Sequence, residues 1–433
     1  MNNLIQFLEK YFVPVAGRIG AQRHLVAIRD GFVAIMPLMI LGSFATLFNN
    51  LPIKAYQNFM KSIFGENWTM FGGVLWQGTF AIVSILVAFT IAYNLAKSYD
   101  KDGLSSGVVS VAALLSIMAT TKDGGLPLSW AGALGLFVAI FVALVSTEIF
   151  TRLLGNPKLV IKMPDGVPPA VSKSFAALFP AMITLTIFGL LKVITVKLGM
   201  PDIHQALYDA LQAPISKMAN TLWSAILVAV IIHVLWFFGL HGSNIIEPLM
   251  QAVYLPAIND NIAAFKAGTE ITNIVTKSFF DGFVLLGGSG TTIGLLLAII
   301  LVGRKQKQYY NLSKLSVAPG LFNINEPVVF GLPIVLNPIL FIPFILTPIL
   351  LTIISYVSIA TGLVPKTVVF LPWTTPPIIG GIITSASWKG GVLAAFNLLV
   401  SIIIYIPFVK MAERAFLKSE KQKNQAEPIQ QAK

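Results

Sequence analysis

The chain has 433 residues, of which 56% are hydrophobic and only 11% are charged, and its formal net charge is +12. Soluble domains contain about 25% charged residues, so this composition excludes an ordinary soluble fold and predicts an all-α polytopic membrane protein. The Lys and Arg residues are spread over loops and tails without a basic stripe between aromatic residues. This spread argues against nucleic acid as a partner and indicates a positive-inside topology signal.

The chain contains no cysteine. Disulfides, thiolate metal sites and a phosphorylated cysteine on this chain are therefore excluded. The first thirty residues hold four basic side chains but no short apolar core with a cleavage site, so no signal peptide is expected.

Nine stretches are long and apolar enough to cross a hydrocarbon core, which takes roughly 17 to 25 helical residues. Each must be helical, because lipid offers no hydrogen-bond partner to an open backbone. They lie at 31–48, 71–96, 103–121, 129–151, 174–196, 223–240, 283–302, 339–361 and 390–409.

The basic segment 303–314 and the basic tail from Lys410 predict the cytoplasmic side, as does the basic N-terminus. Both termini on one side require an even number of crossings, so a tenth span must exist. Counting the crossings from the N-terminus to the cytoplasmic segment 303–314 places the tenth span within 241–282, where SNIIEPLMQAVYLPAI is the candidate. Pro248 and Pro256 predict that this span is broken.

Two further segments, 315–338 and 366–388, should enter and leave on one side as re-entrant hairpins, because they are rich in Gly and Pro. Such irregular backbone at membrane depth is typical of transporter substrate sites. The predicted division is a regular half at 1–200, an amphipathic connector at 201–222, an irregular half with the site at 223–409 and a tail at 410–433. The localisation expected is a cell membrane, with multiple passes and both termini cytoplasmic.

The stretch NINEPVVFGLPIVLNP, 323–338, places Glu326 among asparagines and prolines. A charge at mid-membrane costs about 2.5 to 3.5 kcal/mol, so it is either functional or firmly paired. Pro327 bars helix before it, which predicts a turn tip presenting a carboxylate and amides. The alternative is that Glu326 only caps the following helix.

The stretch WFFGLHGSN, 236–244, ends the sixth predicted span and places His241 between two glycines, with Asn244 close behind. This donor and acceptor set suits hydroxyl groups, whereas a lone His is more often structural. Trp236 and Trp373 offer flat apolar faces on which sugar rings stack. The alternative for both is an interfacial aromatic belt.

The remaining polar groups are ascribed smaller roles. Glu148 should pair with Arg152 one turn later, His233 should be structural, and Glu247 and Asp281 fit either role. No nucleotide-binding loop and no HExxH spacing occur, so no metal or cofactor is expected. The Gly-rich GGSGTT, 287–292, predicts close packing or a helix break rather than a phosphate cradle.

Three motifs, MPDGVPPAVSKSFAALFPA (163–181), GLHGSNIIEP (239–248) and NEPVVFGLPIVLNP (325–338), give the chain a specific resemblance over its whole length. It resembles the membrane-embedded enzyme IIC components of the bacterial phosphoenolpyruvate-dependent phosphotransferase system. The similarity is greatest to the lactose, cellobiose and diacetylchitobiose family.

The resemblance implies a homodimer of about ten spans with two re-entrant hairpins, in which the N-terminal half forms most dimer contacts and the C-terminal half binds a β-linked disaccharide. Separate IIA and IIB proteins would relay phosphate to the sugar 6-hydroxyl, so the phosphoryl-carrying residues lie on partners. The resemblance implies that Glu326 and His241 carry the chemistry, with Glu326 as general base. The expected sugar-binding residues are Trp236, Gly242, Asn244, Asn325 and Trp373.

Two alternatives remain open on the residues alone. An ion-coupled secondary sugar transporter would need a gradient but no phosphoryl donor, and a channel would show no saturation. Sequence does not choose between lactose, cellobiose and diacetylchitobiose.

Overall fold

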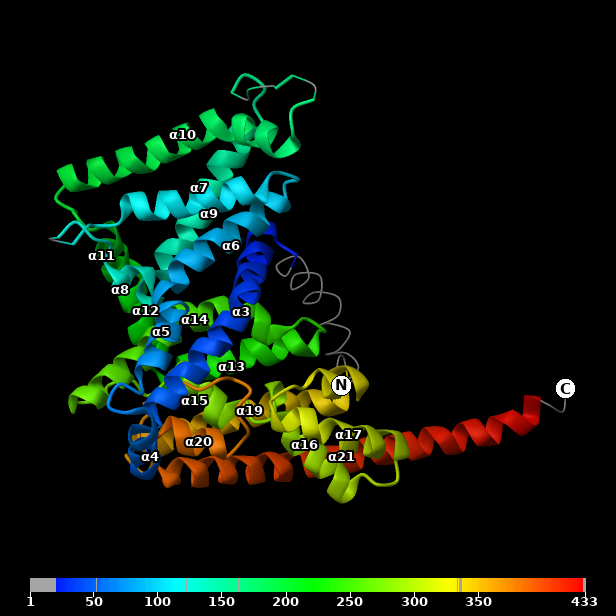
Figure 1. Cartoon of the computed structure of the whole chain (residues 1–433). Coiled ribbons are helices and arrows are strands. Elements are labelled where there is room, and N and C mark those ends of the chain that lie inside the picture. Colours follow the sequence, from blue (N-terminus) through cyan, green and yellow to red (C-terminus); the bar gives the residue numbers. More distant parts are fainter. Residues whose placement is uncertain are drawn as a thin grey trace.

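The computed structural model describes residues 21–430 except 52, 122, 160, 162, 165, 333, 335 and 336. Within these residues the regular structure is entirely helical. The basic residues of the extreme N-terminus, 1–20, and the last three residues of the tail lie outside the described part. Most N-terminal helices lie in the upper part of Figure 1 and most C-terminal helices in the lower part, and α4 (Lys54–Phe64) is an N-terminal helix that lies low in this view.

The N-terminal group is built around α6, which is buried on most of its length and packs against α3, α7 and α9. Val87, Ala88 and Ile91 on α6 are fully buried. The expected pair of Glu148 with Arg152 is confirmed at 2.9 Å. The helices are α3 Arg23–Asn50, α4 Lys54–Phe64, α5 Met70–Gln77, α6 Val83–Lys97, α7 Gly103–Ile117, α8 Leu128–Ala131, α9 Leu136–Leu154 and α10 Pro169–Lys197.

A connector of short helices, α11 Ile203–Leu207 and α12 Ala213–Ala219, leads into α13 Leu222–Phe237 at an angle of 89°. It does not lie wholly on the surface as expected, because the side chain of Gln212 is buried and its Nε2 donates to the Ala252 carbonyl at 3.1 Å. The connector is therefore anchored to α14, Gly242–Ala267.

The C-terminal group holds the largest core, in which Phe279, Phe283, Phe344 and Tyr405 are fully buried. The long α21 runs along the lower edge of Figure 1 and continues beyond the body. The helices after α14 are α15 Lys277–Phe279, α16 Thr292–Val302, α17 Lys307–Leu321, α18 Glu326–Gly331, α19 Pro338–Ala360, α20 Ile379–Thr384 and α21 Trp388–Gln430.

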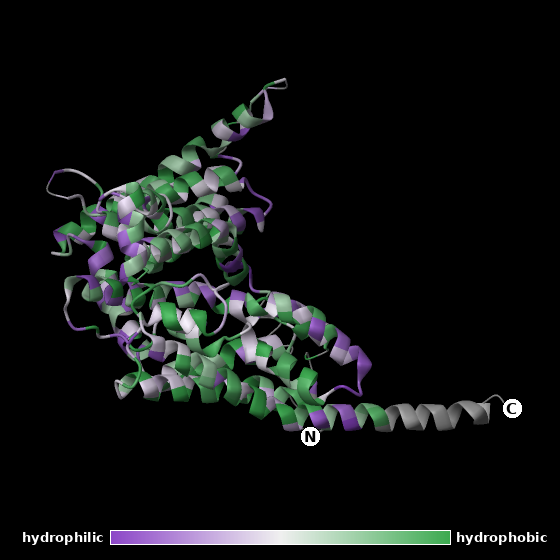
Figure 2. Ribbon diagram, turned by 60° about the horizontal axis from the view of Figure 1, so that its bottom comes forward, coloured by the Kyte–Doolittle hydropathy of each residue, from purple (hydrophilic) through white to green (hydrophobic). Residues whose placement is uncertain are grey.

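Each of the nine stretches expected to span is largely helical, although 283–302 contains a break, and length and composition qualify only some of them as crossings. Seven described helices are long and apolar enough, or eight if the bent pair around residue 220 is one span. The α7 helix, with 15 residues, is shorter than a span. Hydrophobic residues dominate the helices in Figure 2, and hydrophilic ones gather at loops and helix ends. The total of ten stays a prediction.

The expected break in the tenth span is wrong. α14 is one 26-residue helix with Pro248 and Pro256 inside it. Both prolines are buried against neighbouring helices, so tertiary packing outweighs the hydrogen bonds that the two rings remove. Pattern alone overestimated the effect of proline here.

The irregular segments lie where the sequence indicated. The Gly-rich stretch is a helix break before α16, with Gly288 and Gly290 at φ of 92° and 79°. Residues 307–331 form α17, a turn and the six-residue α18, and residues 361–378 are non-helical before α20. These short elements bring loop residues from three places to one cavity.

Candidate functional site

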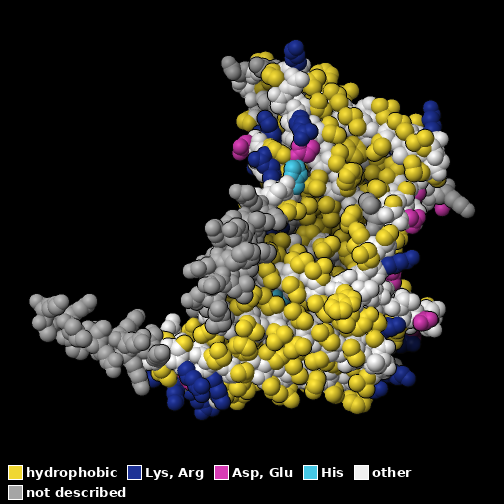
Figure 3. All heavy atoms as spheres, turned by 180° about the vertical axis from the view of Figure 1, so that it is seen from behind, with side chains coloured by type: hydrophobic (Ala, Val, Ile, Leu, Met, Phe, Trp, Pro, Cys, Tyr) yellow, Lys and Arg dark blue, Asp and Glu magenta, His cyan; other side chains and the backbone are white. Residues whose placement is uncertain are grey.

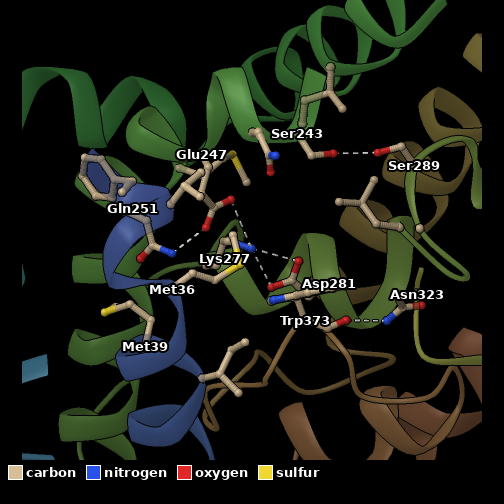
Figure 4. Close-up of a pocket in the computed structure, with 18 of the residues that line it drawn as sticks. Met36, Met39, Ser243, Glu247, Gln251, Lys277, Asp281, Ser289, Asn323 and Trp373 are labelled. Carbon is tan, nitrogen blue, oxygen red and sulfur yellow. Dashed lines mark hydrogen bonds and ion pairs between the residues drawn. The ribbon is translucent and has the colours of Figure 1, made fainter. Parts of the chain in front are cut away.

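A cavity of about 340 Å³ lies between α3 of the N-terminal group and the C-terminal group. This volume is in the usual range for small-molecule sites. One wall is the apolar face of α3, including Met36 and Met39, and the opposite walls carry most of the polar groups, as the close-up in Figure 4 shows. The polar lining comprises Arg29, Ser43, His241, Ser243, Asn244, Glu247, Gln251, Lys277, Asp281, Ser289, Asn323, Asn325 and Glu326.

His241 and Glu326 meet at this cavity although 85 residues separate them in the chain. His241 is the N-cap of α14, where its Nδ1 accepts from the Asn244 backbone N–H at 3.2 Å. Its Nε2 is then free to donate towards Glu326 Oε1, 3.4 Å away. This distance is long for a hydrogen bond, so the contact between His241 and Glu326 is weak.

Glu326 is the first residue of α18 and its side chain is 47% exposed, so the carboxylate faces the cavity rather than the core. An acid in the first turn is favourably placed with respect to the helix dipole. The capping interpretation and the functional one therefore describe the same geometry. The helix end fixes the carboxylate, and the cavity gives it access to a ligand.

The turn before Glu326 is held by the two buried asparagines of the NINEP motif. Asn323 has a left-handed φ of 63°, and its Oδ1 accepts from the Gly287 N–H at 2.7 Å. Its Nδ2 donates to the carbonyls of Trp373 and Thr375, at 2.5 and 3.0 Å. Asn323 thereby ties three irregular segments together, a role that the sequence did not reveal.

Asn325 was expected to bind sugar, and its side chain is buried with Nδ2 donating to the Ser289 carbonyl at 3.0 Å. The backbone of the Gly-rich break lies directly against it, since a Cβ on Gly288 would be 2.7 Å from Asn325 Cγ. Only glycine fits at that contact, which explains why residue 288 is a glycine. Ser289 also meets Ser243 at 2.7 Å, so the break packs onto α14.

Trp236 and Gly242 lie behind the cavity wall. Trp236 is fully buried, its ring centroid is 4.2 Å from that of His241, and its Nε1 donates to Ser243 at 3.2 Å. A Cβ on Gly242 would be 2.0 Å from the Ile232 carbonyl oxygen. The structure thus places both residues as supports of His241, and their direct contact with sugar stays a prediction.

Asn244 and Trp373 do line the cavity. Trp373 is 37% exposed in the non-helical segment before α20, so part of its side chain is accessible to a ligand. His233, expected to be structural, is buried and its Nδ1 hydrogen-bonds the Ala229 carbonyl at 2.5 Å.

A charged cluster forms another part of the cavity, and only its two acids, Glu247 and Asp281, were noted in the sequence. Lys277 Nζ lies 2.9 Å from Asp281 Oδ2 and 3.8 Å from Glu247 Oε2, and Gln251 Nε2 donates to Glu247 at 2.5 Å. The four side chains converge in Figure 4. Lys277 and Gln251 were missed, although a lysine four residues before an aspartate in an apolar run signals a buried pair.

The cavity offers hydrogen-bond donors and acceptors at several points and an apolar wall opposite them. This distribution suits a ligand with many hydroxyl groups and a flat apolar face. Within the described residues no group of three His, Asp or Glu side chains could hold a metal ion.

Comparison with known proteins identifies the family. The model of the phosphotransferase system EIIC family matches residues 29–348. The chain belongs to the phosphotransferase system EIIC family. The resemblance drawn from the three motifs is therefore confirmed, and the protein is placed among membrane transporters.

Curated EIIC proteins are similar over nearly their whole length. The lichenan permease IIC component of Bacillus subtilis (strain 168) is 42% identical, over 97% of this chain and 96% of that protein. The cellobiose-specific EIIC component of Geobacillus stearothermophilus is 39% identical, over 99% and 97%.

A solved structure agrees with the fold. The transporter ChbC, the IIC component of the N,N′-diacetylchitobiose-specific phosphotransferase system, superimposes with a TM-score of 0.90 at 40% identity. The match covers 96% of this chain and 99% of that one. The helical arrangement around the cavity is therefore that of an EIIC transporter.

Proposed function

We propose that this EIIC protein binds a β-linked disaccharide of the cellobiose or diacetylchitobiose type in the cavity and presents its 6-hydroxyl to a separate, phosphorylated EIIB protein. The observation that supports this most is the meeting of His241 and Glu326 at a cavity lined by Trp373 and several hydroxyl-binding groups. The relatives are named for lichenan, cellobiose and N,N′-diacetylchitobiose.

In the transfer step, Glu326 accepts the proton of the sugar 6-hydroxyl. The oxygen of that hydroxyl attacks the phosphorus carried by the EIIB cysteine. The new O–P bond forms as the S–P bond breaks, and the cysteine leaves as a thiolate. His241 donates to the carboxylate or to the same hydroxyl and keeps both in line. A positioned general base typically contributes about 10² to 10⁴ in rate.

The second sugar ring would lie against the charged cluster of Lys277, Asp281, Glu247 and Gln251. The cluster supplies donors and acceptors for ring hydroxyls, and Met36 and Met39 on α3 cover the opposite side. Because α3 belongs to the N-terminal group, a shift between the two groups would open or close the cavity. Such a shift is the usual form of alternating access.

The test is sugar phosphorylation by purified protein with phosphoenolpyruvate and the soluble carriers. Wild-type protein should convert cellobiose or diacetylchitobiose to a 6-phosphate. The Glu326→Gln variant should bind the sugar within a few fold of wild type and lose roughly 10² or more in turnover. The matched control is Glu270→Gln, at an exposed carboxylate beyond α14, which should leave both unchanged. Full turnover by Glu326→Gln would remove Glu326 from the chemistry.

We also propose that two copies associate through the N-terminal half and that both termini face the cytoplasm. α10 exposes many apolar side chains, including Leu178, Leu190 and Ile194, and little of it is buried. Because the chain has no cysteine, single-cysteine variants report contacts without background. Leu190→Cys should cross-link two copies, whereas Leu399→Cys on α21 should not. Equal cross-linking at both positions would contradict this interface.

A further inference from the structure

The loop 303–306 and helices α17 and α21 form a basic surface at one end of the C-terminal group. Figure 3 shows dark-blue Lys and Arg side chains gathered next to the point where α21 leaves the body. The basic face, as we call this surface, consists of the exposed residues Arg304, Lys305, Lys307, Lys314, Lys410 and Arg414. None of these six forms an ion pair with a carboxylate whose side chain the structure describes.

The acidic residue nearest to the basic face, Glu413, is buried beneath it. Glu413 is buried on α21 and its Oε1 accepts from the Lys305 backbone N–H at 2.6 Å. No other Asp or Glu occurs in residues 300–325 or 390–417. The carboxylate therefore fixes the loop against α21 while the outward-facing charges are all positive.

The basic face continues along α17 towards the catalytic carboxylate. Lys307, Asn311, Lys314 and Ala318 are exposed at helical spacing, so they lie in one stripe. α17 has 15 residues and is about 22 Å long, and the turn at its end carries Glu326. The stripe thus connects the basic loop to the site where phosphate must arrive.

Lipid is a poor environment for this stripe. A lysine at membrane depth costs about 2.5 to 3.5 kcal/mol, and Lys314 lies two turns further along α17 than Lys307, in the direction of the cavity. Its Nζ is held 4.8 Å above the Tyr310 ring centroid rather than paired with an acid. The stripe therefore faces water, and its charge is available to a polyanion.

We propose that the basic face is the docking surface for the phosphorylated EIIB carrier, and that Lys307 and Lys314 guide its phosphoryl group along α17 towards Glu326. This inference rests on the proposed function. The phosphothiolate of a soluble carrier is negatively charged, and exposed lysines without an acidic neighbour recognise such a group. Complementary charges of this kind raise encounter rates by about 10 to 10³ and fade with salt.

The experiment is phosphoryl transfer from phosphorylated EIIB to cellobiose, measured with purified protein in zwitterionic nanodiscs at increasing carrier concentration. The double variant Lys307→Glu with Lys314→Glu should raise the KM for the carrier about 10-fold or more, leaving the Kd for cellobiose unchanged. Its rate should also depend less on ionic strength. The matched control is Lys389→Glu, at the opposite end of α21, which should behave as wild type.

The outcomes are separable. Transfer by wild type with an unchanged carrier KM in the double variant overturns the docking surface but leaves the proposed function standing. An equal rise in KM for the Lys389→Glu variant also overturns the docking surface. A defect of the double variant that appears only when anionic lipid is present overturns it as well and assigns the basic face to lipid headgroups. Absence of transfer by wild type refutes the proposed function itself. The neutral variant Lys307→Gln with Lys314→Gln, which keeps side-chain size, should give a smaller KM rise in the same direction.

Discussion

Removal of the Lys277 charge should strongly destabilise the protein. Its side chain and that of Asp281 are 7% and 5% exposed, and their charged atoms are 2.9 Å apart. Replacing Lys277 by Met keeps the side-chain length but leaves Asp281 as a buried carboxylate without its counter-ion. Breaking one side of a buried pair typically costs about 3 to 5 kcal/mol.

The double variant Lys277→Met with Asp281→Leu should be less destabilised than the sum of its two single variants. It removes both charges, and Gln251 still donates to Glu247. Coupling energies of contacting residues are about 0.5 to 3 kcal/mol. The assay is equilibrium unfolding in detergent without sugar. Lys266→Met, at an exposed lysine near the end of α14, is the control and should stay within about 0.5 kcal/mol of wild type.

Two results would refute this reasoning. One is a Lys277→Met variant as stable as the Lys266→Met control, which would mean that the charges do not depend on one another. The other is simple additivity in the double variant.

Two further predictions concern the supports of the site. Gly242→Ala should lower both the melting temperature and the sugar affinity, because the added methyl group would meet the Ile232 carbonyl. The control Gly73→Ala, where nothing lies within 4 Å, should be tolerated. Equal melting temperatures of the two variants would contradict the packing at Gly242. Asn323→Ala should cost about 1 to 3 kcal/mol, because it leaves the Gly287 N–H unsatisfied, and sugar affinity should fall as the Trp373 segment loses its anchor. Unchanged cellobiose binding by Asn323→Ala would show that this anchor is dispensable.

The sequence predicted the helices and the site to different degrees. Long apolar runs located most of the long helices, because a backbone in lipid has no alternative to helix, whereas α14 was located by counting the crossings. The residues Glu326 and His241 could be singled out because a carboxylate beside proline and a histidine between glycines are costly in such surroundings. Their meeting across 85 residues of chain came only from the family resemblance, since spacing carries no tertiary information.

The remaining features depend on packing, which pattern does not encode. α14 continues through two prolines because its surroundings are buried. A tryptophan such as Trp236 is a residue type on which sugar rings stack, yet in the fold its ring packs against the His241 ring from behind the cavity wall. Asn323 was noted only as one amide among several, because its three hydrogen bonds reach segments that lie far away in sequence. Lys277 was missed because its spacing of four residues from Asp281 was not interpreted as a buried pair.

The most direct measurement is a structure of the protein with cellobiose or diacetylchitobiose bound. We expect the sugar 6-hydroxyl oxygen within about 2.6 to 3.2 Å of a Glu326 carboxylate oxygen, the distance required of a general base. We also expect His241 at the same hydroxyl or at the carboxylate, and the second ring against the Lys277 cluster. A disaccharide bound with its 6-hydroxyl away from Glu326 would contradict the proposed role of this carboxylate.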